Sequence, residues 1–93
     1  MISEWKDKEA EKIWNMQSST KLPEDIQKTA RRKLIMLNSA ISINDLRIPP
    51  ANHLEELHGD REGQHSIRIN DKYRICFYWN KGNLIIEDIV DYH

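Results

Sequence analysis

QHSIRINDKYRICFYWNKGNLIIEDIVDYH, residues 64–93, alternates apolar and polar side chains over most of its length. Alternation of this kind is typical of β-strands that bury one face, because successive side chains point to opposite sides of a sheet. It is interrupted by ND and by NKGN, which are residue types that favour turns. The stretch therefore predicts a three-stranded antiparallel meander made of QHSIRIN, KYRICFYW and NLIIEDIVDY.

The residues before the meander favour helices. MISEW predicts a short N-terminal strand, and KDKEAEKIWNMQ (6–17) has apolar side chains at helical spacing. A second helix is predicted over residues 23–40, because Pro23 suits the first helical position and two acidic residues follow it. Its apolar stripe consists of Ile26, Ala30, Leu34, Leu37 and Ile41. Helices followed by strands predict an α+β fold, with the helices packed on one face of the sheet.

Between these parts, residues 42–47 are expected to add one helical turn. Pro49 and Pro50 then forbid a regular element and impose an extended crossing. A chain of 93 residues without a linker predicts one domain, residues 1–93. Within it, Cys76 is the single cysteine and lies among apolar residues, so a structural role in a reducing compartment is expected.

Composition also limits the compartment and the partners. No window approaches the run of about 20 apolar residues that a membrane span needs, and the N-terminus is charged where a signal peptide is apolar. A cytoplasmic protein without membrane contact is expected. The net charge is −1, but residues 21–33 carry five basic and two acidic side chains, and residues 64–81 carry four and one, a net of +3 in each block. For the first block, a solvated surface is the simplest interpretation.

The last hairpin predicts a polar face on the meander. If KG forms a two-residue tip, Lys72 lies opposite Asp91, and Arg74 lies diagonally next to that aspartate. His93 then falls on the same face, one step beyond Asp91, whereas Tyr92 alternates to the opposite face.

The first hairpin adds a second arginine to this face. Burying Ile67 with Ile75 requires a three-residue loop or a bulge between the strands, and it places Arg68 directly opposite Arg74. Like charges in that position are destabilising, so the pair is expected to share an anion such as a phosphate. Two alternatives remain: the register differs by one, or each arginine pairs with a neighbouring acid such as Asp91 or Glu87.

Phosphate-binding and titratable groups thus converge on one polar face beside a glycine-flanked loop. The set comprises Arg68, Arg74, Asp91, His93, His58 and Arg61. Such a set, without an evident metal site, suits acid–base cleavage of RNA. A metal site built from the four histidines is disfavoured, because their spacing gives no helical i, i+4 pair and no cysteine cluster.

The run LEELHGDREGQHSIRINDKYRICFYW (54–79), followed by the terminal VDYH, closely resembles the HigB-type toxins of bacterial toxin–antitoxin modules, within the RelE/ParE superfamily. The likeness extends to LPEDIQKTARRKL (22–34) and NDLRIPPANHLE (44–55). It implies a RelE-like fold, in which an N-terminal strand and two helices pack on a curved antiparallel sheet. It also implies a ribosome-dependent endoribonuclease that cuts messenger RNA in the decoding site and needs no cofactor.

The resemblance further implies partners and site residues. The partners are a HigA-type helix-turn-helix antitoxin, the 70S ribosome with messenger RNA, and operator DNA through the antitoxin only. Arg74 matches the family arginine that binds the scissile phosphate, and Asp91, Tyr92 and His93 match the functional C-terminal triplet. Arg61 and Arg68 match recurrent basic positions, and Lys72 is a further phosphate-binding candidate beside them.

The histidines differ in their expected roles. His58 stands where many relatives have a lysine, so it could exchange protons but would hold phosphate less reliably. His53 is either the family's other histidine or a solvated loop residue, and His65 is expected to have a surface or packing role. The competing function is that of the ParE branch, non-enzymatic inhibition of DNA gyrase, which the combination of Arg74 with the Asp-Tyr-His end disfavours.

Overall fold

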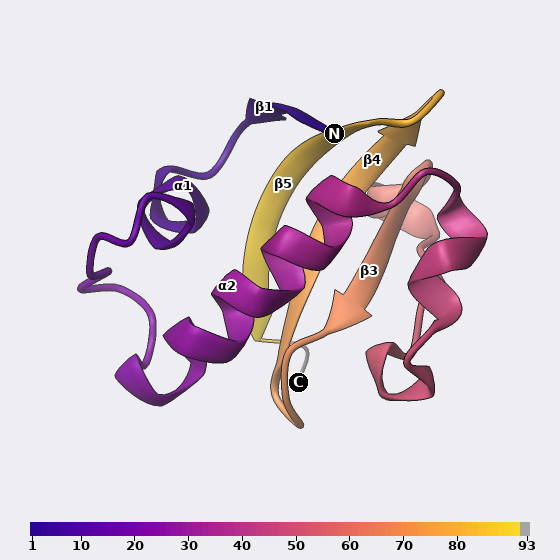
Figure 1. The fold of residues 1–93 in the computed structure, drawn as a ribbon. Helices are drawn as coiled ribbons and strands as arrows, with labels where there is room; N and C mark the ends of the chain where they lie inside the picture. The colour runs from indigo at the N-terminus through magenta and orange to yellow at the C-terminus, as the bar shows by residue number, and fades with distance from the viewer. Residues whose placement is uncertain (92–93) are drawn as a thin grey trace.

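The computed structural model describes residues 1–91 and shows two layers, with two helices lying across one face of a curved sheet (Figure 1). The helices are α1 (Lys8–Trp14) and α2 (Glu24–Ser39). The sheet has the order β1-β5-β4-β3-β2. Its strands are β1 (Ile2–Trp5), β2 (Glu55–Glu56), β3 (Gln64–Arg68), β4 (Tyr73–Asn80) and β5 (Asn83–Asp91). The α+β prediction is therefore confirmed, and within residues 1–91 no helix is long and apolar enough to cross a bilayer.

The predicted meander is confirmed as β3, β4 and β5, which pair antiparallel in succession. The sheet as a whole is mixed rather than wholly antiparallel, because β1 runs parallel to β5. The strand β2 pairs with β3 at the other edge. The sequence did not predict β2, because its two glutamates, Glu55 and Glu56, show no alternation of apolar and polar side chains.

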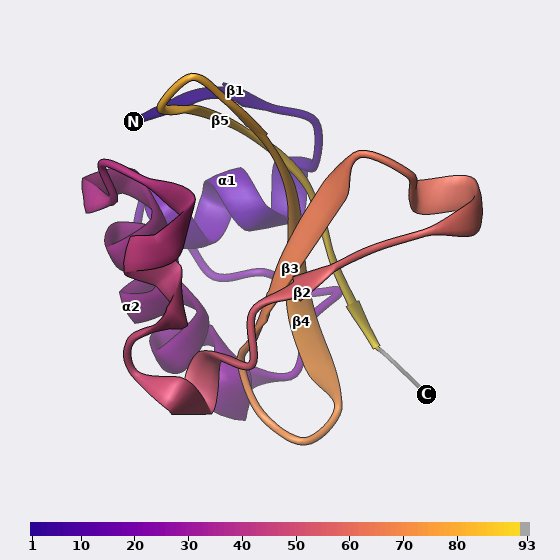
Figure 2. The same ribbon diagram turned by 90° about the vertical axis from the view of Figure 1, so that its right-hand side faces the viewer.

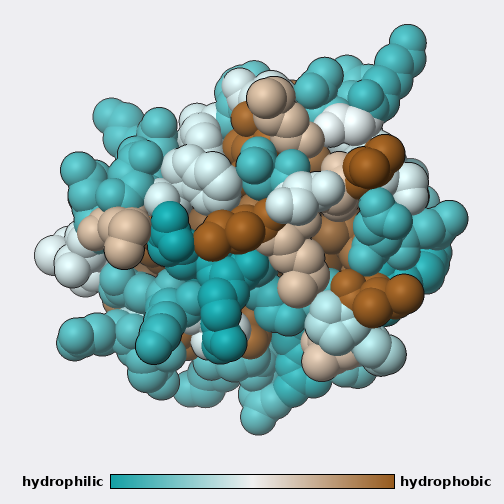
Figure 3. Space-filling view, viewed as in Figure 1, coloured by the Kyte–Doolittle hydropathy of each residue, from teal (hydrophilic) through white to brown (hydrophobic). Residues whose placement is uncertain are grey.

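The core lies between α2 and the sheet. Four of the five predicted stripe residues, Ile26, Ala30, Leu34 and Leu37, are buried, and they pack with side chains of β3, β4 and β5. Ile41 was predicted wrongly, since the helix ends at Ser39 and leaves this side chain 87% exposed. Seen from the helix side, exposed apolar side chains form separate patches within a mainly polar surface (Figure 3).

The connection from α2 to the sheet consists of short helical turns. The helical turn predicted at residues 42–47 is confirmed as the 3-10 helix η1 (Ile43–Arg47). The expected extended crossing is only partly correct, because η2 (Pro50–Asn52) begins at the second proline. Proline can occupy the first position of a helix, where its missing N–H leaves no hydrogen bond unmade.

The register of β4 and β5 contains a β-bulge that the sequence analysis did not predict. The tip is as expected, since Asn80 pairs with Asn83, but Phe77 pairs with Ile86 whereas Cys76 pairs with Asp88. The extra residue at position 87 shifts every later pair by one, because two residues of β5 then oppose one of β4. The bulge allows both Ile86 and Ile89, which are three positions apart, to be buried on the same face.

The bulge overturns the predicted position of Asp91. Asp91 pairs with Tyr73 rather than with Lys72, and Arg74 pairs with Val90. Since directly paired residues share a face, Asp91 belongs to the face of Tyr73 and not to that of Arg74. Asp88, paired with Cys76, takes a position on the arginine side of the sheet.

Candidate active site

The candidate site lies on the sheet face that the helices leave uncovered, called here the polar face. Its residues on β3, β4 and β5 are Gln64, Ser66, Arg68, Arg74, Cys76, Tyr78 and Asp88. The loop that carries η3 (Gly59–Arg61) and the end of β5 at Asp91 both project on this side, away from α1 and α2 (Figure 2). The polar face is therefore bordered by the two segments in which the sequence predicted functional side chains.

Arg74 is the most firmly held residue of this face. It is only 6% exposed, and its Nε donates a 2.7 Å hydrogen bond to Ser66 Oγ. Its Nη2 donates to the carbonyl oxygens of Ser66 and His53, and its Nη1 lies 3.9 Å from Glu55 Oε1. Several donors are thus directed by protein acceptors, which holds the guanidinium in one orientation.

Arg68 stands directly opposite Arg74, as predicted, and residues 69–72 join the two strands, with the Ile69 N–H donating to the Tyr73 carbonyl oxygen. The two guanidiniums are nevertheless directed apart. Arg68 donates to the Asn70 carbonyl oxygen and forms an ion pair with Asp71 in the loop. The alternative of separate acidic partners is therefore confirmed, with Glu55 beside Arg74 and Asp71 beside Arg68. The register alone does not require a shared anion.

Arg61 is tied to the sheet by a bidentate ion pair. Its Nη1 and Nη2 donate to the two carboxylate oxygens of Asp88 at 3.0 and 2.8 Å, and its Nη1 also donates to Gln64 Oε1. The hydrogen bonding that Arg61 donates to the Asp88 carboxylate raises the pKa of Arg61, which keeps the guanidinium charged. Cys76 is fully buried, and that burial raises its thiol pKa to about 11, in agreement with a structural role.

We expect the Arg61–Asp88 pair to stabilise the loop against the sheet. Both side chains are about one-third exposed, at 34% and 29%, so solvent weakens their attraction. A double-mutant cycle with Arg61→Gln and Asp88→Asn should give a coupling free energy of about 1 kcal/mol in urea unfolding. The His58–Glu62 pair is the control, since both its side chains are 74% exposed, and its coupling should be near zero. Strictly additive effects of Arg61→Gln and Asp88→Asn would contradict this role.

The other predicted site residues are more exposed. His58 precedes η3, and its Nδ1 lies 3.2 Å from Glu62 Oε2. Lys72 lies in the β3–β4 loop, which Asn70 closes by accepting hydrogen bonds from the backbone N–H groups of Lys72 and Tyr73. Tyr92 and His93 lie outside the described residues. The structure thus places Arg68 and Arg74 opposite each other with their guanidiniums directed apart, places Arg61 and His58 on the adjoining loop, and puts Asp91 on the other face by register.

The remaining histidines have identifiable local roles. His53 has a left-handed backbone (φ 43°), and its carbonyl oxygen accepts a hydrogen bond from Arg74. His65 is stacked on Phe77 with ring centroids 6.2 Å apart, which confirms the packing role predicted for it. Among residues 1–91, no group of three or more His, Cys, Asp or Glu side chains has the arrangement of a metal site.

Sequence reasoning missed three residues of the site. Ser66 and Glu55 contact Arg74, and Asp88 binds Arg61. Asp88 could have been found, because the three-residue interval between Ile86 and Ile89 signals a bulge that turns the intervening positions. Glu55 carried no such signal, since its position depends on how the chain returns from η2 to the sheet edge.

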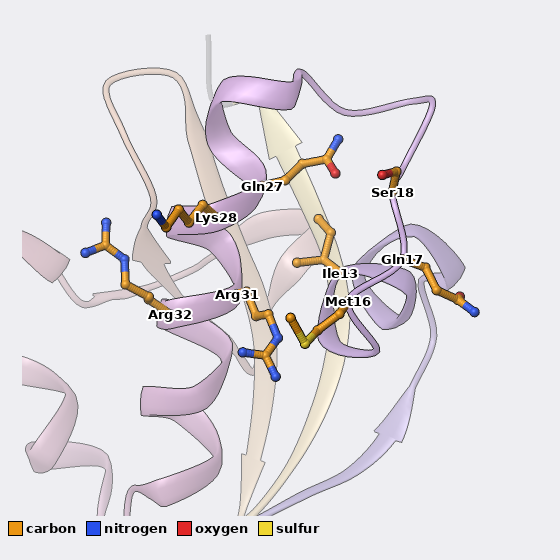
Figure 4. A pocket seen from close by; sticks show the side chains of 8 residues that line it. All are labelled: Ile13, Met16, Gln17, Ser18, Gln27, Lys28, Arg31 and Arg32. Atoms are coloured by element: carbon orange, nitrogen blue, oxygen red, sulfur yellow. The ribbon is translucent and has the colours of Figure 1, made fainter.

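A separate groove lies between α1 and α2, far from the chemistry of the polar face (Figure 4). It has a volume of about 460 Å³ and includes Ile13 and Met16. Arg31 lies beside Met16 and donates from Nε to the Trp14 carbonyl oxygen, and Arg32 also contributes to the lining of this groove. The groove contains no pair of titratable groups suited to acid–base catalysis.

Known proteins resemble this chain in sequence over most of its length. A family model described as "RelE-like toxin of type II toxin-antitoxin system HigB" matches residues 3–93. The chain is 41% identical over 83 residues to Toxin HigB-1 of Vibrio cholerae serotype O1, which covers 88% of this chain and 87% of that protein. It is also 40% identical over 65 residues to an uncharacterized protein of Haemophilus influenzae, covering 70% of this chain and 64% of that protein.

Solved structures show the same fold. A chain of the YoeB-YefM complex from Staphylococcus aureus superposes with a TM-score of 0.64 at 19% identity, over 100% of this chain and 95% of that chain. A chain of the heterotetrameric YoeB-YefM toxin-antitoxin complex from the same organism gives a TM-score of 0.63 at the same identity. At this identity the likeness establishes the fold alone.

Proposed function

Because the chain belongs to the HigB family of RelE-like toxins from type II toxin–antitoxin systems, we propose that it is an endoribonuclease that cuts messenger RNA in the ribosomal decoding site. The observation that carries the proposal is the fixed guanidinium of Arg74 on the polar face, held by Ser66 and by the His53 carbonyl oxygen. An oriented cation of this kind can stabilise the charge that develops on a phosphate during cleavage.

Cleavage without a metal requires a general base, a general acid and a cation that stabilises the charge on the phosphate. A base removes the proton of the 2′-hydroxyl, the 2′-oxygen attacks phosphorus, and an acid protonates the 5′-oxygen as its bond to phosphorus breaks. We assign charge stabilisation to Arg74, and proton transfer to His93 together with His58. A phosphate at Arg74 would compete with Glu55, whose carboxylate lies 3.9 Å from Nη1.

The geometry changes the roles proposed for the other residues. Arg61 is bound to Asp88 and Gln64, so we propose that it positions the loop that carries His58. Arg68 and Lys72, near the β3–β4 loop, are proposed to contact RNA on either side of the scissile phosphate. Asp91 pairs with Tyr73, and we therefore propose that it orients the C-terminal residues rather than binding phosphate.

The ribosome is part of this proposal, because it presents a codon in a defined position and thereby lowers the entropic cost of alignment. We further propose a HigA-type antitoxin that neutralises the toxin and recognises operator DNA, and a cytoplasmic location beside the translating ribosomes. An antitoxin partner is supported by the family match, and the structurally similar chains come from toxin–antitoxin complexes.

Primer extension on messenger RNA tests substrate and dependence on the ribosome together. Purified protein should cut messenger RNA bound to 70S ribosomes within the codon presented in the decoding site, and should cut the same RNA without ribosomes at least about a hundredfold more slowly. Equal rates on free and ribosome-bound RNA would contradict the proposal. Damage to DNA that depends on gyrase, without cleavage of messenger RNA, would instead indicate the ParE-like function.

A further inference from the structure

A second basic site lies on the helix side of the sheet, between α2 and the β3–β4 loop. It is a surface cavity of about 480 Å³. Arg32 and Lys33 of α2 contribute to its lining, together with Arg68 at the end of β3. Its lining includes no acidic side chain, so three cations share the cavity without a carboxylate inside it. A concave surface with this charge is suited to a compact anion.

The positive charges of Lys33 and Arg32 repel each other in this cavity. Lys33 Nζ donates a 2.6 Å hydrogen bond to Asn52 Oδ1, which is a neutral acceptor. Burial of the amine, followed by the nearby charge of Arg32, lowers the pKa of Lys33. Among residues 1–91, neither Lys33 nor Arg32 forms an ion pair with a carboxylate. Within the same residues, the Arg32 side chain donates a hydrogen bond only to the Thr29 hydroxyl. An anion in the cavity would relieve the repulsion.

Arg68 connects this cavity to the candidate active site. Its backbone pairs with Arg74 across β3 and β4, while its side chain lines the cavity. The guanidinium is kept at the edge of the sheet by the Asn70 carbonyl oxygen and by Asp71, whose side chain is 89% exposed. Arg68 therefore lies between Arg74 on the polar face and the cations of α2, so a nucleic-acid strand held at Arg74 could reach the cavity around this end of the sheet.

We propose that this cavity binds a backbone phosphate of the RNA strand whose scissile phosphate lies at Arg74. The inference rests on the proposed endoribonuclease function and adds to it a second anchoring point, separate from the reacting groups. Phosphate contacts hold a nucleic acid in register without reading its sequence. The cavity would thus fix the strand relative to the polar face whatever codon is present.

The neighbouring residues Arg31 and Arg32 provide a matched pair of variants. They carry the same charge and both line the groove between α1 and α2, but of the two only Arg32 also lines the proposed phosphate site (Figure 4). The probe is a fluorescent 2′-O-methyl RNA of about 12 nucleotides, which cannot undergo attack by the 2′-oxygen, and binding is measured by anisotropy over a range of salt concentrations. Arg32→Gln should weaken binding about fivefold and reduce the salt dependence by about one phosphate contact. Arg31→Gln should change neither.

Further arms separate the site from its alternatives. Lys33→Gln should weaken binding of the long probe as Arg32→Gln does. Loss of the hydrogen bond from Lys33 to Asn52 can also destabilise the fold. If Lys33→Gln is unstable, the test depends on Arg32→Gln, because Arg32 is exposed. A dinucleotide probe should lose less affinity through Arg32→Gln than the long probe does, because its single bridging phosphate cannot occupy both sites at once. Equal losses for Arg31→Gln and Arg32→Gln, or for short and long probes, would overturn the proposal. The proposal would also be overturned if inorganic phosphate displaced the long probe at a concentration equal to that of the RNA phosphates.

The same proteins are assayed for cleavage on 70S ribosomes. Suppose the wild type does not cut messenger RNA, but Arg32→Gln weakens binding of the long probe and Arg31→Gln does not. The proposed enzymatic function is then wrong, and the proposed phosphate site is supported. If the wild type cuts messenger RNA but Arg32→Gln binds the long probe as Arg31→Gln does, the proposed phosphate site is wrong and the enzymatic function is supported.

Discussion

Arg74→Ala is expected to lower the rate of messenger RNA cleavage on the ribosome by about a thousandfold. The reason is electrostatic, because the variant removes the one guanidinium of the polar face that is buried and held by several protein acceptors. Donors fixed before the reaction need no reorganisation when charge develops on the phosphate. Single-turnover cleavage of ribosome-bound messenger RNA, followed by primer extension, measures this loss directly.

Arg74 also supports the structure, so its replacement needs controls for folding. Arg74→Ala leaves Ser66 and the His53 carbonyl oxygen without a donor, which should cost about 1–3 kcal/mol in the free energy of unfolding. Ser66→Ala removes one of these hydrogen bonds but keeps the cation, and should reduce cleavage only about tenfold. Arg74→Lys keeps the charge and loses the forked geometry, and it should remain close to alanine in rate.

These variants separate catalysis from stability. If Arg74→Ala is folded by circular dichroism at the assay temperature and still cuts messenger RNA at the wild-type rate, the assignment of the scissile phosphate to Arg74 is wrong. If Ser66→Ala loses as much activity as Arg74→Ala, the hydroxyl itself must take part in the reaction.

Local patterns predicted most of the fold. Alternation over residues 64–91 was sufficient for the meander and for the Asn80–Asn83 tip, and the apolar stripe of α2 was correct up to Leu37. Ile41 failed because the position of a helix end depends on capping and on the following chain, not on periodicity. The strands β1 and β2 join distant parts of the sequence, and the pairing of such edges is not encoded locally.

The candidate site was predicted less completely, and the errors have two physical causes. The position of Asp91 was wrong because the strand was counted as regular through Glu87, although burial of both Ile86 and Ile89 requires a bulge. The shared anion between Arg68 and Arg74 was not required, because Glu55 and Asp71 supply separate partners. Glu55 reaches Arg74 only through the tertiary path of the chain after His53, which has a left-handed backbone.

His93→Gln is the second variant with a large expected effect. An imidazole that transfers a proton in the transition state contributes about a hundredfold to ten-thousandfold, so a loss in that range is expected at pH 7. Stability should not change, because the described core residues extend no further along the chain than Ile89. The measurement is again single-turnover cleavage on ribosomes, with thermal unfolding in parallel.

The dependence of the cleavage rate on pH distinguishes proton transfer by His93 from a role in shape. A histidine titrates near pH 6.5, so the wild-type rate should change slope near that pH, and His93→Gln should lose this change along with most of its activity. His58→Gln is the companion variant, because His58 is the other group proposed for proton transfer and is exposed, with Glu62 as its ion-pair partner among residues 1–91. We expect it to lose about a hundredfold and to keep the slope assigned to His93. An unchanged pH profile in His93→Gln would assign proton transfer to another group, and His58 would then be the first residue to test.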